Sequence, residues 1–437
     1  MARSRGRDRQ NKSETTVRII FCKGQLHGPI SGADEALVTS AVQIKKAGHS
    51  VSVLLMYPPA QEDRYWQRLK AAGVPLSCVA SRFATTSLGT GRNLGRKILS
   101  MIPASKRIIR DGALPVVTGL ARRHYEQCRD YLKKQNPDLI HIITPDPGAM
   151  VMIRAGHEAG IPVIYQELGL PYHPPDFASY YHQFTSVLSL CTEVAALSPK
   201  LLKHCRNELP VSNSLSILPV MSEETTNGHH IWPIKNGHIN FGFASRIEAL
   251  KGPLVLMGAF AATNQRVPNT RLKIAGDGSQ REKLTARAKS LKVLSHYEYI
   301  GVYTQVEERD TFMHELDVFV LPSFTEGTPL CIIEAMAKAK PIIASAVGGI
   351  PDMIDSESGI LVPPGDEDAL TNAMTSLAQN PAQRAKMGQA ARERYLKLFS
   401  PEAVVPLMLE TYSRLAAVNG KPQIEHKSSH PWRTPAI

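Results

Sequence analysis

Glu326 and Glu334 lie at two positions of the run EGTPLCIIEAMA and could bind hydroxyl groups or take part in proton transfer. Glu334 falls within an otherwise apolar helical pattern, which predicts a largely buried helix. A buried carboxylate costs several kcal/mol unless it is hydrogen-bonded, so Glu334 needs a basic partner or ligand hydroxyls such as those of a ribose. The plainer alternatives are a helix-start residue for Glu326 and a structural ion pair for Glu334.

The predicted helix begins directly after the predicted strand VFVLP (318–322), with Thr328 as N-cap and Pro329 at the first helical position. The first amides of such a helix carry the positive end of its dipole, and Gly327 leaves room for a ligand to approach the backbone. This helix start is therefore a suitable cradle for a diphosphate.

The pattern E-x7-E, with EGTPL and EAMA inside it, closely resembles the signature of the retaining GT-B glycosyltransferases of family four, the glycosyl transferases group 1. The resemblance implies that Glu326 contacts the donor sugar and Glu334 the nucleotide ribose. It extends the donor-binding set to Gly327, Thr328 and Leu330. The two carboxylates would then bind hydroxyls rather than act as a general acid and base.

The string GFASRIEALKG (242–252) resembles the family's basic pair after the first strand of the donor domain, which implies that Arg246 and Lys251 face the diphosphate. The departing nucleoside diphosphate gains negative charge as the glycosidic bond breaks, and cations stabilise it strongly in a water-poor cleft. The predicted catalytic set is Glu326, Arg246 and Lys251, without a metal. Two solvated loop cations are the alternative.

Several glycines match positions where the family's backbone contacts the donor. Gly276 and Gly278 in LKIAGDGS, and Gly301 in YIGVY, correspond to contacts with the nucleobase, although tight turns alone would also explain them. Gly32 in PISGADEA corresponds to the glycine-rich first loop, with Ser31 in place of the first of two glycines.

The first half departs from the family pattern. The family often has a histidine after the strand equivalent to PVIY (162–165), whereas this chain continues QELGLPYH, where Glu167 and His173 are the alternatives. His141 in DLIHII is read as a core residue. The usual Asn-Gly-Val-Asp near the linker is replaced by ILPVMSEE, which affects only hinge contacts.

Short apolar runs alternate with helical patterns along the chain, which predicts an α/β protein with two facing Rossmann-like doubly wound domains, the GT-B architecture. Its active site should lie in the interdomain cleft. We expect a disordered basic tail (1–15), an acceptor-binding N-terminal domain (16–218) and a nucleotide-sugar-binding C-terminal domain (219–399). A helix (400–418) should pack back on the N-terminal domain before a disordered tail (419–437).

Composition narrows the class of protein. A chain of 437 residues exceeds a single core, and 43% hydrophobic residues fit a globular protein. Residues 1–220 hold 28 Lys and Arg against 16 Asp and Glu, which accounts for the net charge of +12. The segment 92–110 combines basic and apolar residues, so it predicts an anionic membrane surface or anionic acceptor as partner, or else a solvated helix face.

The sequence shows no secretory signal, spanning segment or CxxC pair, so we expect a cytoplasmic protein, peripheral at the inner face of the membrane if the basic segment binds lipid. The predicted function is transfer of a sugar from a UDP-, GDP- or ADP-linked donor to a glycan, lipid-linked or small-molecule acceptor, with retention of configuration and no permanently bound cofactor. The alternatives are a sugar-nucleotide epimerase, a catalytically silent GT-B subunit and, with no motif to support it, a nucleic-acid-binding protein.

Overall fold

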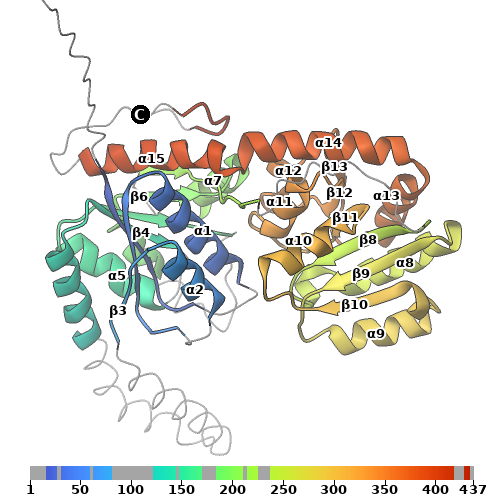
Figure 1. Ribbon diagram of the computed structural model, residues 1–437, viewed down its shortest axis with the longest axis horizontal. Helices are drawn as coiled ribbons and strands as arrows, with labels where there is room; N and C mark the ends of the chain where they lie inside the picture. Colours follow the sequence, from blue (N-terminus) through green and yellow to red (C-terminus); the bar gives the residue numbers. More distant parts are fainter. Residues whose placement is uncertain are drawn as a thin grey trace, which may run out of the picture.

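The computed structural model describes residues 16–26, 31–59, 63–80, 122–143, 147–169, 184–209, 214–224, 237–417 and 428–433. Two parallel sheets, each flanked by helices, lie next to each other along the long axis of the molecule (Figure 1). The predicted α/β class with two doubly wound sheets is confirmed.

The first sheet has the strand order β3-β2-β1-β4-β5-β6-β7, and all its pairs are parallel. Its strands are β1 (Arg18–Lys23), β2 (Ser50–Leu55), β3 (Leu76–Cys78), β4 (Leu139–Ile143), β5 (Val163–Gln166), β6 (Glu193–Ala196) and β7 (Ser214–Ile217). Helices α1 (Gly32–Lys46), α2 (Arg64–Ala71), α5 (Pro147–Glu158) and α7 (Pro199–Glu208) belong to the same half. Every residue of β4 is buried, as expected for a strand with helices over both faces.

The second sheet repeats this order as β10-β9-β8-β11-β12-β13. Its strands are β8 (Ile239–Ala244), β9 (Thr270–Ala275), β10 (Tyr297–Gly301), β11 (Val318–Leu321), β12 (Ile342–Ser345) and β13 (Gly359–Val362). The accompanying helices are α8 (Pro253–Arg266), α9 (Arg281–Ser290), α10 (Val306–His314), α11 (Leu330–Ala337), α12 (Ile350–Met353) and α13 (Glu367–Gln379), with 3-10 turns η2 (Ala249–Lys251) and η3 (Leu294–His296).

The strand order reverses between β1 and β4 in the first sheet and between β8 and β11 in the second. Loops that leave the carboxyl ends of strands on either side of such a reversal diverge, so each reversal opens a crevice. The loops after β8 and β11 carry Arg246, Lys251 and Glu326. The fold therefore brings residues about 75 positions apart in sequence to one edge of the second sheet.

Two long helices finish the main body of the chain. Helix α14 (Pro381–Leu398) belongs to the second half, whereas α15 (Pro401–Ala417) lies along the first (Figure 1). Val404, Leu407 and Tyr412 of α15 join the apolar core formed by Ile19, Phe21 and other residues of the first half. The last helix therefore crosses back and completes the core of a domain whose strands lie far earlier in the sequence.

The predicted disorder of residues 419–437 is wrong for residues 428–433. His430 is buried, with Nε2 3.0 Å from the Leu398 carbonyl oxygen. The Trp432 ring packs edge-on against Phe399, with ring centroids 5.5 Å apart. Sequence polarity suggested a solvated tail, but this aromatic contact supplies an apolar anchor.

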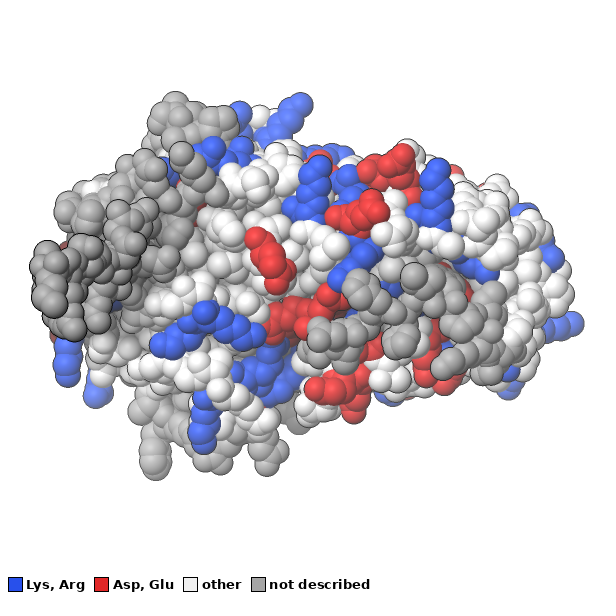
Figure 2. Space-filling model, turned by 45° about the horizontal axis from the view of Figure 1, so that its top comes forward, with Lys and Arg blue, Asp and Glu red and all other residues white. Residues whose placement is uncertain are grey.

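Charged side chains of both signs lie next to each other across the middle of the face drawn in Figure 2. Residues 1–15 and 81–121 lie outside the described residues, and so does the predicted membrane segment 92–110, which is part of the second range. These two ranges hold 12 of the 28 basic residues of the first half and 3 of its 16 acidic residues. No helix within the described ranges is long and apolar enough to cross a membrane.

Candidate active site

A cavity of about 360 Å³ lies between the two halves of the molecule, lined by residues from both. From the first half come the loop and start of α1, the start of α2, and Leu168. From the second half come the ends of β8 and β9, the start of α10, and the loop and helix 326–334. The predicted residues that line it are Gly32, Arg246, Lys251, Gly276, Glu326, Gly327, Thr328, Leu330 and Glu334.

Lys251 and Glu326 form a buried ion pair in the wall of this cavity. Lys251 Nζ lies 2.6 Å from Glu326 Oε1, and their side chains are 15% and 7% exposed. The Ser323 hydroxyl donates a second hydrogen bond to the same oxygen at 2.7 Å. Lys251 ends the turn η2, where Gly252 follows with φ of 67°. The predicted diphosphate cation thus lies within hydrogen-bonding distance of the predicted sugar-binding carboxylate.

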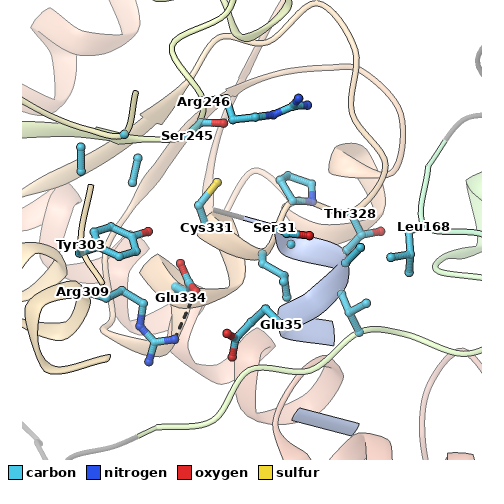
Figure 3. Close-up of a pocket in the computed structure, with 18 of the residues that line it drawn as sticks. Ser31, Glu35, Leu168, Ser245, Arg246, Tyr303, Arg309, Thr328, Cys331 and Glu334 are labelled. Atoms are coloured by element: carbon cyan, nitrogen blue, oxygen red, sulfur yellow. Dashed lines mark hydrogen bonds and ion pairs between the residues drawn. The ribbon is translucent and has the colours of Figure 1, made fainter. Parts of the chain in front are cut away.

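Arg246 extends from the end of β8 along the side of the pocket opposite Glu334 (Figure 3). Arg246 and Glu334 therefore lie on different walls of the cavity, and the loop before α11 lines it as well.

The start of α11 differs from the prediction by one residue. Pro329 is the N-cap, and the helix begins at Leu330. The reason is that Pro329 has an extended ψ of 120°, so the chain becomes helical only after it. Thr328 is therefore not the N-cap, and its buried Oγ1 has no hydrogen-bond partner among the described residues. Thr328 is nevertheless one of the residues that line the cavity.

Gly327 brings the two halves of the molecule into contact. A Cβ built on Gly327 would lie 2.1 Å from the Leu168 carbonyl oxygen, which belongs to the first half. A Cβ built on Gly32, in the first half, would lie 3.7 Å from Leu330 Cδ1, in the second half. The absence of a side chain at Gly327 therefore allows the loop before α11 to approach the Leu168 backbone, whereas the contact at Gly32 would tolerate a Cβ.

Glu334 has a basic partner, Arg309 of α10, which the sequence reading missed. Arg309 Nη1 lies 3.2 Å from Glu334 Oε1, and both side chains are at least nine-tenths buried. Burial raises the pKa of Glu334, while the Arg309 guanidinium acts in the opposite direction. The structural ion pair considered as an alternative is therefore present, and it lies in the wall of the cavity (Figure 3).

Glu35 on α1 is a second residue that the sequence reading missed. Both of its carboxylate oxygens accept hydrogen bonds from Arg68 Nη1, at 2.7 and 2.8 Å. Arg64 Nη2 lies 3.7 Å from Glu35 Oε2. Burial alone would raise the pKa of Glu35, but the guanidinium groups of Arg68, Arg309 and Arg64 together outweigh it and the pKa is lowered. Neither Glu35 nor Arg309 belongs to a sequence pattern that distinguishes it from a solvated helix residue.

The remaining predicted glycines shape the loops behind the cavity. Gly276 has φ of 126° and donates its amide to the Gly301 carbonyl at 2.8 Å, and a Cβ on it would lie 1.9 Å from the Ser245 carbonyl oxygen. Gly278 would place a Cβ 2.6 Å from the Ile247 carbonyl oxygen. Unlike Gly276, neither Gly278 nor Gly301 lines the cavity. Gly301 is the last residue of β10, and Gly278 lies in the segment between β9 and α9.

Glu167 and His141 lie in the core of the first half. The Glu167 carboxylate accepts hydrogen bonds from the Tyr165 hydroxyl at 2.9 Å and from the Gly169 amide at 3.2 Å, and it does not line the cavity. Burial lowers the pKa of His141 to about 3, and its Nδ1 lies 2.6 Å from the Tyr412 hydroxyl oxygen. His173, the other alternative, lies outside the described residues.

Comparisons with known proteins point to one family. The model of the family "Glycosyl transferases group 1" matches residues 225–394. A glycogen synthase of Mycobacterium tuberculosis is 29% identical over 198 residues, which covers 44% of this chain and 47% of that protein. A GDP-mannose-dependent alpha-(1-6)-phosphatidylinositol monomannoside mannosyltransferase of Mycolicibacterium smegmatis is 34% identical over 159 residues, 34% of this chain and 41% of that one.

The chain thus spans about half the length of these curated relatives. The fold likeness extends further. The crystal structure of Anabaena Alr3699/HepE in complex with UDP aligns over 91% of this chain and 100% of that one, with a TM-score of 0.68 and 17% identity. At this identity the likeness establishes the two-domain GT-B fold.

Proposed function

We propose that this chain, whose residues 225–394 match the model of the family "Glycosyl transferases group 1", transfers a sugar from a nucleotide-sugar donor to an acceptor bound by the first half. The observation that carries the proposal is the Lys251–Glu326 pair beside Arg246 in the wall of an interdomain cavity. The complexes of the structural relative Alr3699/HepE with UDP and with UDP-glucose support a nucleotide-linked donor.

Each group in the cavity has a defined task in this proposal. Arg246 and Lys251 stabilise the negative charge that grows on the diphosphate as it leaves. The first amides of α11 bind phosphate oxygens, because Leu330 and Cys331 line the cavity at the positive end of the helix dipole. Glu326 accepts hydrogen bonds from donor-sugar hydroxyls, while Glu334 accepts them from the ribose.

We further propose that the anomeric configuration is retained. The bond from the anomeric carbon to the diphosphate oxygen breaks, a bond to the acceptor oxygen forms on the same face, and the acceptor proton passes to an oxygen of the departing diphosphate. This route needs no protein base. It is compatible with the pairing of Glu326 with Lys251, which means that the Glu326 carboxylate is not a free base. Product analysis by NMR of the anomeric linkage distinguishes it from inversion.

The proposed acceptor is a glycan, a lipid-linked sugar or a small molecule. The relative from Mycolicibacterium smegmatis is named for a phosphatidylinositol mannoside, which makes a lipid-linked acceptor one reasonable choice. Attachment to an anionic membrane through the basic segment 92–110 stays a prediction. Binding to anionic liposomes at low salt, with release at high salt, would support it.

The decisive experiment uses a panel of UDP-, GDP- and ADP-linked sugars. The purified protein should hydrolyse its own donor slowly without an acceptor, and that donor should raise the melting temperature. Acceptor-independent interconversion of the donor sugar would instead indicate an epimerase, and binding without turnover in any acceptor screen would indicate a silent subunit.

Variants of the ion pair test the catalytic assignment. Lys251→Met and Glu326→Gln should each lower donor turnover by about 10²–10³-fold, the usual effect of removing one charge-stabilising group. Lys273→Met is the matched control, since Lys273 pairs with Glu298 and Glu315 away from the cavity. Turnover by folded Lys251→Met equal to that of Lys273→Met would contradict the assignment.

A further inference from the structure

The Arg309 guanidinium is fixed in place by hydrogen bonds on two sides. Its Nε and Nη2 lie 3.1 and 3.0 Å from Asp310 Oδ1, and its Nη1 lies 3.2 Å from Glu334 Oε1. Asp310 is held in turn by Lys338, whose Nζ lies 3.0 Å from Oδ2. Three of the four side chains are less than 11% exposed, and Lys338 is 11% exposed. A guanidinium held this way leaves its partner carboxylate little freedom to change direction.

The Arg309–Glu334 pair of this cluster faces the cavity, whereas most ion pairs among the described residues do not. Arg309, Glu334 and Tyr303 all line the cavity (Figure 3). The Arg394–Asp355 pair, with Nη1 2.6 Å from Oδ2, offers a contrast, because neither residue lines it. An ion pair that only joins two helices does not require its carboxylate to line a cavity.

Charged side chains from three elements lie around Glu334. Arg309 of α10 and Arg64 of α2 favour its ionised form, whereas Glu35 of α1 disfavours it, and the uncharged Tyr303 and Cys331 lie close by. Burial also acts against ionisation. Arg309 is the only one of these cations for which a direct ion pair with Glu334 is found in the described part of the chain.

We propose that Arg309 is a positioning residue that keeps Glu334 ionised and aimed at the cavity, so that Glu334 selects a ribose-containing over a deoxyribose-containing nucleoside diphosphate. The inference rests on the proposed function and deepens it. An ionised carboxylate can accept hydrogen bonds from both vicinal hydroxyls of a ribose, whereas a protonated or rotated one loses at least one of them. Arg309 itself need not touch the donor.

The role of Arg309 is tested by the ratio of two dissociation constants, that of a deoxyribonucleoside diphosphate and that of the corresponding ribonucleoside diphosphate. Dissociation constants of UDP and dUDP, GDP and dGDP, and ADP and dADP would be measured for the wild type and for Arg309→Met, Arg309→Lys and Arg394→Met. The wild type should prefer the ribonucleotide of its own base by about tenfold or more, the usual size of a hydrogen bond to a charged group. Arg309→Met should bring this ratio close to one.

The controls separate positioning from general loss of structure. Arg309→Lys should recover part of the ratio, and Arg394→Met, which breaks a comparable ion pair elsewhere, should leave it unchanged. Because Arg309 lowers the pKa of Glu334, the acid limb of the binding profile should move to higher pH in Arg309→Met. Circular dichroism would verify that each variant is folded.

Two outcomes would overturn the inference, and they are distinguishable. A folded Arg309→Met that keeps the wild-type ratio and pH profile shows that Arg309 does not act through Glu334, and the proposed function survives. A wild type that binds no nucleoside diphosphate of the panel refutes the proposed function, and the inference fails with it.

Discussion

Glu167 is a carboxyl group with an altered pKa that does not face the cavity. Burial raises its pKa to about 7, against the opposing effect of hydrogen bonds from Tyr165 and from the Gly169 and Leu168 amides. The group is therefore close to half ionised at neutral pH in the folded protein. In the unfolded chain it would ionise near its ordinary value of about 4.3.

This difference predicts a pH-dependent effect of Glu167→Gln on stability. Between about pH 4.3 and pH 7 the folded state binds the extra proton, so the wild-type free energy of unfolding falls as pH rises through this window. Glutamine removes the cost of ionisation while keeping an acceptor for Tyr165. The variant should therefore gain stability relative to wild type between pH 5 and pH 8, by up to about 3 kcal/mol.

Urea unfolding at pH 5 and pH 8 measures this effect. Glu208→Gln, at an exposed carboxyl group on α7, is the matched control and should show the same difference from wild type at both pH values. A pH-independent difference for Glu167→Gln would contradict the raised pKa.

At the level of elements, two glycines at the ends of β9 and β10 differ in how much space surrounds them. Gly276 and Gly301 both have positive φ, at 126° and 84°. A Cβ on Gly276 would clash with the Ser245 carbonyl oxygen, whereas a Cβ on Gly301 would meet no atom within 4 Å. Ser245 precedes Arg246, so a shift at Gly276 would be passed to the proposed diphosphate site.

Gly276→Ala should therefore cost more than Gly301→Ala. We expect about 1–2 kcal/mol for Gly301→Ala from backbone strain alone, and at least about 3 kcal/mol for Gly276→Ala because the clash adds to the strain. Gly276→Ala should also weaken binding of the preferred nucleoside diphosphate, while Gly301→Ala should leave it nearly unchanged. Chemical denaturation and calorimetric titration measure the two effects, and equal losses in both variants would contradict this explanation.

At the level of the whole molecule, α15 ties the end of the chain to the first half. Leu407 is 4% exposed and belongs to the core that contains strands β1 and β4, whereas Leu396 on α14 is 48% exposed. The Tyr412 hydroxyl oxygen also contacts His141 of β4. The stability of the first half should thus depend on residues that follow the second half in sequence.

Leu407→Ala should destabilise the protein by about 2–5 kcal/mol, because it leaves a cavity in this core. Hydrogen exchange should show loss of protection in β1 and β4 and little change in β8 and β11. Leu396→Ala is the control, with an expected change within about 0.5 kcal/mol. Uniform loss of protection in both sheets would show that α15 does not stabilise the first half selectively.

Local patterns predicted much of this structure. The predicted strand VFVLP (318–322) is observed as β11 (Val318–Leu321), and the helix expected over residues 400–418 is observed as α15 (Pro401–Ala417), because the apolar patterns of both segments are strong and a proline bounds each. The start of α11 is off by one residue, since the backbone angles of Pro329 decide it and no spacing rule supplies them. The anchor around Trp432 was missed because its partner, Phe399, belongs to another helix end.

The sequence by itself determined which residues could bind a nucleotide sugar, since Glu326, Glu334, Arg246 and Lys251 lie in local motifs whose spacing is visible along the chain. Only the tertiary structure decided their partners. Lys251 pairs with Glu326, 75 residues further along the chain, and Arg309 pairs with Glu334. Glu35, from the first half, acts electrostatically on both Arg309 and Glu334. The physical reason is that ion pairs depend on distance in space and on burial, and neither is encoded by spacing along the chain.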